Sequence, residues 1–143
     1  MTYAAFRSIG AYIPPKIMTN ADFEKIIDTS DEWITKRTGI KERRISEVDE
    51  ASSDLGARAA QVAIERAGIS KEEIDLVICA TVTPDYLCMP STACLIAAKV
   101  GLPPVMAFDI SAACTGFVYA VSIAKAFVEK KKKKNVLIIG AET

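Results

Sequence analysis

The sequence predicts an α/β domain built on a mainly parallel sheet. Three short apolar runs rich in β-branched residues, 76–81, 105–110 and 136–140, are typical of strands covered on both faces. Helical patterns separate these runs, so the second half of the chain alternates strand, helix, strand, helix, strand. No linker, repeat or low-complexity segment divides the 143 residues, whose number fits one domain, 1–143.

Helix signals fill the intervals between the strands and also occur in the first part of the chain. Capping boxes at 29–32 and 70–73 mark helix starts, and Gly39, Gly68 and Gly101 stand where left-handed C-caps are expected. The expected elements are an extended segment over 3–13, a short helix over 20–27, a helix from 29 to Gly39, a loop over 41–53, a helix over 53–67, one turn after 70, a loop over 82–90, a helix over 91–100 and a helix from about 114 to the lysines at 130–134.

Apolar spacing also predicts which face of the helix over 53–67 is buried. Apolar residues recur there at three- and four-residue steps. The expected buried set is Leu55, Ala59, Val62, Ala63 and Ala67. Its many alanines would allow close packing against a sheet or another helix.

The composition excludes several kinds of chemistry and partner. The 18 basic and 18 acidic residues give a formal net charge of zero, so no overall field attracts nucleic acid or an anionic membrane. The lysines at 130–134 are expected to be a solvated helix end. Without histidine, Ser-His and Cys-His pairs within the chain are excluded, and no pattern supports a metal site.

Cysteine usage and the apolar stretches predict a cytoplasmic protein. The four cysteines show no C-x-x-C spacing, which favours free thiols. The N-terminus lacks the pattern of a signal peptide, and no apolar stretch approaches the ~18 residues of a membrane span.

The segment AFDISAACTG, residues 107–116, is the first candidate site. A buried strand leads through small residues into Cys114 at an expected helix start. Small side chains permit a tight strand-to-helix turn at the edge of the sheet, where open α/β folds have their crevices. The unpaired amides of a first helical turn would stabilise a thiolate and an oxyanion. The alternative is that Cys114 is a small buried hydrophobe, as many free cysteines are.

Two further segments have the composition of binding sites. In TSDEWITKRTGIKERR, residues 29–44, the sole tryptophan, Trp33, precedes five basic residues and one acid. An aromatic ring can stack on a base while arginine binds phosphate; the alternative is a helix with Trp33 in the core. In TVTPDYLCMP, residues 81–90, an apolar tip would mark a partner or ligand contact; the alternative is a loop folded back onto its own core.

Together and in this order, these segments resemble the first half of the β-ketoacyl-acyl-carrier-protein synthase III family, the initiating condensing enzymes of type II fatty acid synthesis. The resemblance covers essentially the whole chain. It implies a thiolase-like fold, the N-terminal half of a pseudo-symmetric α-β-α-β-α architecture with a mainly parallel mixed sheet. The matching pieces are IGAYIPP, DTSDEWITKRTGIKERR, LVICATVTPD, MPSTA, FDISAACTGF and VLIIGAE.

The resemblance implies roles for five residues. Cys114 corresponds to the nucleophile that takes an acyl group from an acyl-CoA primer, which is expected to be acetyl-CoA. Trp33 and Arg37 match residues that sandwich the adenine of coenzyme A, and Thr29 matches a further contact to it. Met89 stands where the family often has a phenylalanine that reaches across a homodimer into the neighbour's acyl pocket. Methionine at this position departs from the family pattern, and because its side chain is flexible the length of the acyl primer is left open.

The implied reaction has two steps and needs more residues than these 143. The acyl-enzyme would condense with malonyl-acyl-carrier protein, releasing CO₂ and giving a β-ketoacyl product, with no cofactor besides the acyl-CoA substrate. The histidine and asparagine that serve decarboxylation lie in the family's second half, so the chain is expected to be an N-terminal half that is inactive alone. The alternatives are a related acyltransferase that makes a specialised ketone or polyketide, and a non-catalytic CoA-binding or dimerisation module.

Overall fold

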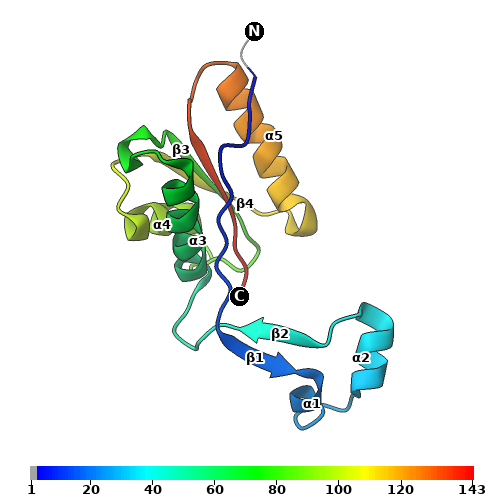
Figure 1. Ribbon diagram of the computed structural model, residues 1–143. Helices are drawn as coiled ribbons and strands as arrows, with labels where there is room; N and C mark the ends of the chain where they lie inside the picture. The colour runs from blue at the N-terminus through cyan, green and yellow to red at the C-terminus, as the bar shows by residue number, and fades with distance from the viewer. Residues whose placement is uncertain (1–2) are drawn as a thin grey trace. The chain divides into compact units, whose positions relative to one another are not determined.

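The chain forms two compact units in the computed structural model, which describes residues 3–143 (Figure 1). The larger unit comprises the segment up to Tyr12 together with Glu50–Thr143, and the smaller unit comprises Ile13–Asp49. None of the helices in the described part of the chain is long and apolar enough to cross a membrane.

The larger unit is built on a sheet of three parallel strands, as the sequence predicts. The strands β3 (Leu76–Ala80), β4 (Met106–Ile110) and β5 (Val136–Gly140) lie in the order β4-β3-β5. Every residue of the central strand β3 is buried. Ala80 pairs with Ile110 on one side and with Gly140 on the other, so the three carboxyl ends lie level.

Helices cover both faces of this sheet (Figure 1). One face packs against α3 (Ser52–Ala67) and α4 (Thr92–Val100), and the other packs against α5 (Gly116–Glu129). Alternate residues of β3 enter the two cores, with Val77 on the first face and Ile78 on the second. Gly68 and Gly101 end α3 and α4 with positive φ angles of 62° and 76°, which confirms both predicted C-caps.

The predicted buried face of α3 is wrong. None of the five predicted residues is fully buried, and the buried residues are instead Ser52, Ser53, Gly56, Ala57, Ala60 and Ile64. A helix with this many small residues offers two packing faces, and only one of them meets α4 and the sheet.

The N-terminal segment lies on the other face of α3. Ser8 Oγ donates to the Ala63 carbonyl at 2.6 Å, and Arg66 donates to the Ile9 carbonyl at 2.9 Å. A Cβ on Gly10 would lie 2.4 Å from the carbonyl oxygen of Ala59, so only glycine fits there. The segment 3–13, expected to be extended, belongs to no sheet, and its residues 8 and 9 are hydrogen-bonded to α3.

The smaller unit contains a two-stranded antiparallel sheet that the sequence reading missed. Strand β1 (Lys16–Thr19) pairs with β2 (Glu42–Ile45), so the loop expected over 41–53 is wrong at Glu42–Ile45. The sequence ERRI lacks the apolar alternation of a half-buried strand. Its position is fixed by β1 and by Arg43, which donates to Asn20 Oδ1 at 2.8 Å and lies over the ring of Phe23.

Both helices of the smaller unit are displaced from their predicted bounds. Helix α1 (Asn20–Phe23) is four residues long, so the helix expected over 20–27 is wrong beyond Phe23. Helix α2 (Asp31–Thr38) is capped by Ser30, whose Oγ accepts from the Trp33 amide at 3.1 Å, and not by Thr29. The predicted end at Gly39 is confirmed by its φ of 73°.

Candidate functional site

Cys114 lies in the turn between β4 and α5, at the carboxyl edge of the parallel sheet. Ala113–Thr115 form one turn of 3₁₀ helix and α5 begins at Gly116, two residues later than the predicted start near Cys114. Ala113 has a φ of 44°, in the left-handed region, which costs an alanine about 1 kcal/mol. The small residues before Cys114 therefore form the tight turn that the sequence predicts, and the structure adds the strain at Ala113.

The thiol of Cys114 is exposed, so the alternative of a small buried hydrophobe does not hold. Gly116 lets the start of α5 pack closely against β3, because a Cβ at this position would lie 3.3 Å from the Cβ of Ala80. The start of α5 is thus held against the end of β3. Its N-terminal amides give the region beside Cys114 a partial positive charge that suits an oxyanion.

Cys79 is the opposite case among the cysteines. It is fully buried in the central strand, and this burial raises the pKa of its thiol to about 12. A thiol that stays protonated is a poor nucleophile. Cys79 is therefore not a candidate nucleophile, whereas Cys114 is exposed at the carboxyl edge of the sheet.

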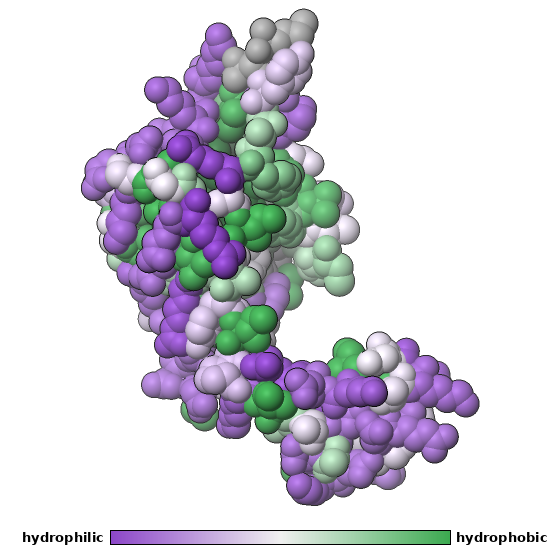
Figure 2. Space-filling view, in the orientation of Figure 1, coloured by the Kyte–Doolittle hydropathy of each residue, from purple (hydrophilic) through white to green (hydrophobic). Residues whose placement is uncertain are grey.

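The loop between β3 and α4 leaves the same edge of the sheet. Its residues 86–90 are all exposed, with Leu87 at 100% and Met89 at 75% exposure, so the loop does not fold back onto its own core. Figure 2 shows further hydrophobic side chains at the surface of the larger unit around the first turns of α5, where Val118 is 62% exposed. The apolar tip that the sequence predicts is therefore available to a ligand or partner.

In the smaller unit, the structure brings together the three residues that the resemblance assigns to coenzyme A. Arg37 lies over the ring of Trp33, with the guanidinium carbon 5.4 Å from the ring centroid. Trp33 is 56% exposed, so it is not the core residue of the alternative interpretation. Thr29 and Trp33 line one open hollow of about 350 Å³ together with Asp28 and Ser30. An exposed ring beside a cation is suited to stacking on a nucleobase.

Three carboxylates at the carboxyl edge of the sheet were not predicted from the sequence. Asp109, on β4, accepts from the amides of Thr92 and Ala93 at 2.7 Å each and so caps α4. Asp85, in the base of the exposed loop, accepts from Ser53, and Glu142 accepts from the amides of Val82 and Thr83 in the same base. A charged residue inside the apolar run MAFDI was the one signal that could have marked Asp109.

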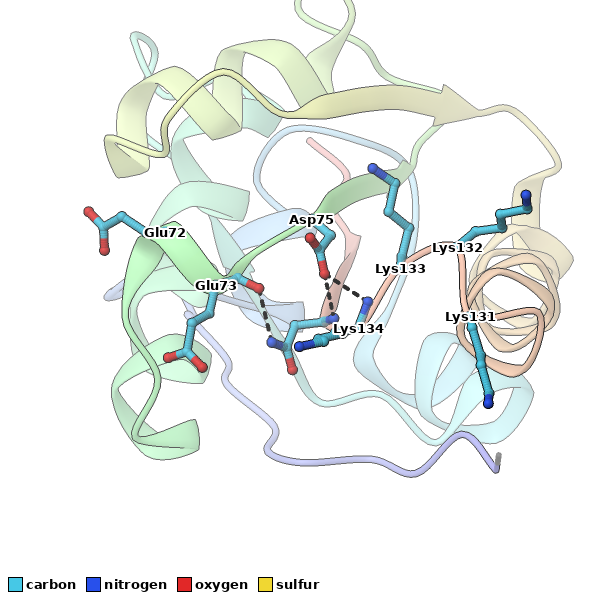
Figure 3. A pocket seen from close by; sticks show the side chains of 8 residues that line it. Glu72, Glu73, Asp75, Lys131, Lys132, Lys133 and Lys134 are labelled. Atoms are coloured by element: carbon cyan, nitrogen blue, oxygen red, sulfur yellow. Dashed lines mark hydrogen bonds between the residues drawn. The ribbon is translucent and has the colours of Figure 1, made fainter. Parts of the chain in front are cut away.

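A larger hollow of about 440 Å³ lies at the opposite, amino edge of the sheet (Figure 3). Asp75 accepts there from the amides of Lys134 and Asn135, at 2.7 and 3.1 Å, which lowers its pKa. These bonds join the starts of β3 and β5. The hollow is lined by surface lysines and acids, as expected for a solvated helix end, and lies far from Cys114.

Comparisons with known proteins agree with this architecture. A family model described as 3-oxoacyl-[acyl-carrier-protein (ACP)] synthase III matches residues 108–143. The chain is 84% identical over 142 residues to the β-ketoacyl-[acyl-carrier-protein] synthase III of Aliarcobacter butzleri, covering 99% of this chain and 43% of that protein. It is 68% identical to the synthase of the same name from Sulfurimonas denitrificans, with the same coverage.

Solved structures show the same relationship. The 3-oxoacyl-[acyl-carrier-protein] synthase III of Aquifex aeolicus matches with a TM-score of 0.91 and 54% identity, covering 94% of this chain and 43% of that one. The priming β-ketosynthase of the R1128 polyketide pathway matches with a TM-score of 0.94 and 37% identity, covering 99% and 42%. The chain thus spans about 43% of the length of the curated relatives it matches.

The parallel sheet covered on both faces and the cysteine turn at its carboxyl edge define a thiolase-like α/β protein, which confirms the predicted fold class. Within that class, the chain is similar to the β-ketoacyl-[acyl-carrier-protein] synthase III proteins over 99% of its own length and about 43% of theirs.

Proposed function

We propose that this chain carries the acyl-accepting part of a condensing enzyme that initiates fatty acid synthesis. The observation that carries the proposal is the exposed Cys114 thiol in a strained turn at the carboxyl edge of the sheet. In the first step, the Cys114 thiolate attacks the carbonyl carbon of acetyl-CoA. A new carbon–sulfur bond forms, the thioester bond to coenzyme A breaks, and coenzyme A leaves as its thiolate.

Coenzyme A is held in this proposal by Thr29, Trp33 and Arg37. Adenine stacks on the Trp33 ring, and the Arg37 guanidinium, which now covers that ring at 5.4 Å, moves to the far side of the base. Because Trp33 is the sole tryptophan, its fluorescence reports binding directly. We expect coenzyme A to quench it and phosphopantetheine, which lacks adenine, to leave it unchanged. Equal quenching by both compounds would refute the stacked adenine.

The second step joins the acyl group to a malonyl unit. Malonyl-acyl-carrier protein loses CO₂, its carbanion attacks the acyl carbonyl carbon, and the Cys114 thiolate leaves to give a β-ketoacyl-acyl-carrier protein. The chain contains no histidine, so the histidine and asparagine that the family resemblance implies come, in this proposal, from a further half beside domain 1–143. We place the working enzyme in the cytoplasm as a homodimer, with Met89 at the neighbour's acyl pocket.

Mass spectrometry of the intact chain tests the first step. After incubation with acetyl-CoA, we expect one added acetyl group, absent in the Cys114→Ser variant. With malonyl-acyl-carrier protein also present, the 143-residue chain is expected to form no β-ketoacyl product. Sustained product from the chain alone would refute the need for a further half.

A joined enzyme tests the whole reaction. It consists of this chain followed by the part of the Aliarcobacter butzleri relative outside the matched 142 residues, and we expect it to condense acetyl-CoA with malonyl-acyl-carrier protein. If the Cys114→Ser variant of the joined enzyme keeps its activity, the chain is instead a non-catalytic CoA-binding or dimerisation module.

A second candidate function is the priming of a specialised ketone or polyketide. It is favoured by the TM-score of 0.94 to a polyketide priming ketosynthase. A panel of acyl-CoA primers and extender units separates the two, because an enzyme of fatty acid initiation is expected to use acetyl-CoA and malonyl-acyl-carrier protein best.

A further inference from the structure

The loop between β3 and α4 has a firmly bonded base, residues 81–85, and an exposed apolar tip, residues 86–89. Every residue of the tip is exposed, and Met89 is 75% exposed. Two carboxylates bind the base to other segments of the larger unit, one from Asp85 within the base and one from Glu142 after β5. The tip therefore extends from a base with a fixed position.

Asp85 ties the base to the first turn of α3. Its carboxylate accepts from the amide and the hydroxyl of Ser53, at 2.9 and 2.5 Å. Ser53 is 0% exposed, and its hydroxyl in turn accepts from Lys99 Nζ at 2.6 Å. The N-cap residue of α3 is Ala51, which has no side-chain acceptor, so Asp85 satisfies an amide that would otherwise be buried without a partner.

Glu142 ties the start of the base to the segment after β5. Its carboxylate accepts from the amides of Val82 and Thr83 at 3.0 and 3.1 Å, and from the Thr83 hydroxyl at 2.6 Å. On the other side, the Ser52 hydroxyl donates to the Thr83 carbonyl at 2.6 Å. Thr83 is thus fixed even when Asp85 is absent.

The position of Asp85 decides how much chain is free to move. With Asp85 bonded, five residues, 86–90, lie between it and the capping residue Ser91. Without these hydrogen bonds, the free segment begins after Thr83 and therefore also includes residues 84 and 85. Two residues add up to ~7 Å of extended chain, which is enough for the tip to take up many positions.

We propose that Asp85 is a positioning residue that sets primer selection by fixing the tip that carries Met89. The base leaves the sheet beside the Cys114 turn, since the Thr81 amide donates to the carbonyl of Ile110, the last residue of β4, at 3.1 Å. This inference rests on the proposed function. In the proposed homodimer, a fixed tip closes the neighbour's acyl pocket at one depth, and a released tip lets that pocket accept longer acyl chains.

The test compares Asp85→Ala with Asp75→Ala in the joined enzyme. Asp75 is a matched control, because its carboxylate also accepts two hydrogen bonds from the same unit, at the opposite edge of the sheet (Figure 3). We measure kcat and KM for acetyl-CoA and for hexanoyl-CoA. In Asp85→Ala, we expect the kcat/KM ratio of hexanoyl-CoA to acetyl-CoA to rise at least about fivefold, mainly through KM, while Asp75→Ala leaves the ratio within about twofold.

Two further measurements complete the test. Asp85→Asn keeps one acceptor oxygen and is expected to give an intermediate ratio. Hydrogen exchange on the 143-residue chain is expected to show faster exchange of the Ser53 amide and the tip in Asp85→Ala, with the strands unchanged. An unchanged ratio in an active Asp85→Ala enzyme, or the same rise in Asp75→Ala, would overturn this inference alone. A joined enzyme that condenses no primer, beside an active Aliarcobacter butzleri enzyme, would overturn the proposed function as well.

Discussion

Replacing Asp109 by alanine is expected to weaken the joint between β4 and α4. The Asp109 carboxylate accepts from the amides of Thr92 and Ala93 at 2.7 Å each, and both residues are 0% exposed. Truncation to alanine leaves the two amides buried without an acceptor. The separate cap from Ser91, which accepts from the Cys94 amide, remains.

The magnitude follows from the cost of the two orphaned amides. Each buried donor left without a partner costs about 1–3 kcal/mol, so we expect Asp109→Ala to lower the free energy of unfolding by about 3 kcal/mol. Asp109→Asn keeps one carbonyl oxygen and is expected to lose roughly half as much. Urea denaturation of the 143-residue chain, followed by circular dichroism, measures both values.

The matched control is Asp49→Ala, because Asp49 is exposed in the smaller unit. We expect it to change the free energy of unfolding by less than about 0.5 kcal/mol. An Asp109→Ala variant as stable as this control would refute the reasoning, since it would mean that the two amides find water or another acceptor.

Four other changes are expected to give measurable results. Gly10→Ala should lower the free energy of unfolding by about 1–3 kcal/mol, because the new Cβ meets the backbone of α3; a stable variant would contradict this close approach. Thr92→Val should be neutral or stabilising by up to about 1 kcal/mol, because Thr92 Oγ1 is buried without a hydrogen-bond partner among residues 3–143; a clear loss in urea denaturation would reveal a hidden partner. Iodoacetamide at pH 8 should label three cysteines of the folded chain and reach Cys79 only after unfolding; a fourth label on the folded chain, seen by mass spectrometry, would refute its burial. The pKa of Asp75 is lower in the folded chain than in the unfolded chain, so the stabilisation by its carboxylate is present above the unfolded pKa and is lost as the pH falls toward the folded pKa. Asp75→Asn should therefore flatten the fall in unfolding free energy between about pH 5 and pH 3. An unchanged slope would contradict the lowered pKa of Asp75.

The elements that the sequence predicts well are those whose signal is local. The three parallel strands stand out as apolar runs, although only β3 is buried throughout as predicted, while β4 and β5 are partly exposed. The left-handed C-caps coincide with glycines. The turn at Cys114 was also predictable, because the small residues at 111–113 permit a tight strand-to-helix connection, although the positive φ of Ala113 was not.

The errors arise where a distant segment supplies the deciding contact. The strand Glu42–Ile45 exists because it pairs with β1, and its own charged residues give no sign of it. The buried face of α3 was misassigned because the N-terminal segment takes one of two possible faces. The cap of α2 moved to Ser30, where Glu24 accepts from the amide of Asp31 at 2.6 Å.

The sequence by itself determined the class of fold and marked Cys114 as a candidate nucleophile, because residue types at short spacing are translated into structure by local sterics and helix geometry. The roles of Thr29, Trp33 and Arg37 are predictions that rest on the family resemblance and not on spacing.

Only the tertiary structure decided that the Trp33 ring is exposed and that Asp85 and Glu142 hold the loop carrying Met89. Glu142 and Val82 are about sixty positions apart in the sequence. They come together because parallel strands must be joined by helical crossovers, which bring the ends of distant strands to one edge of the sheet.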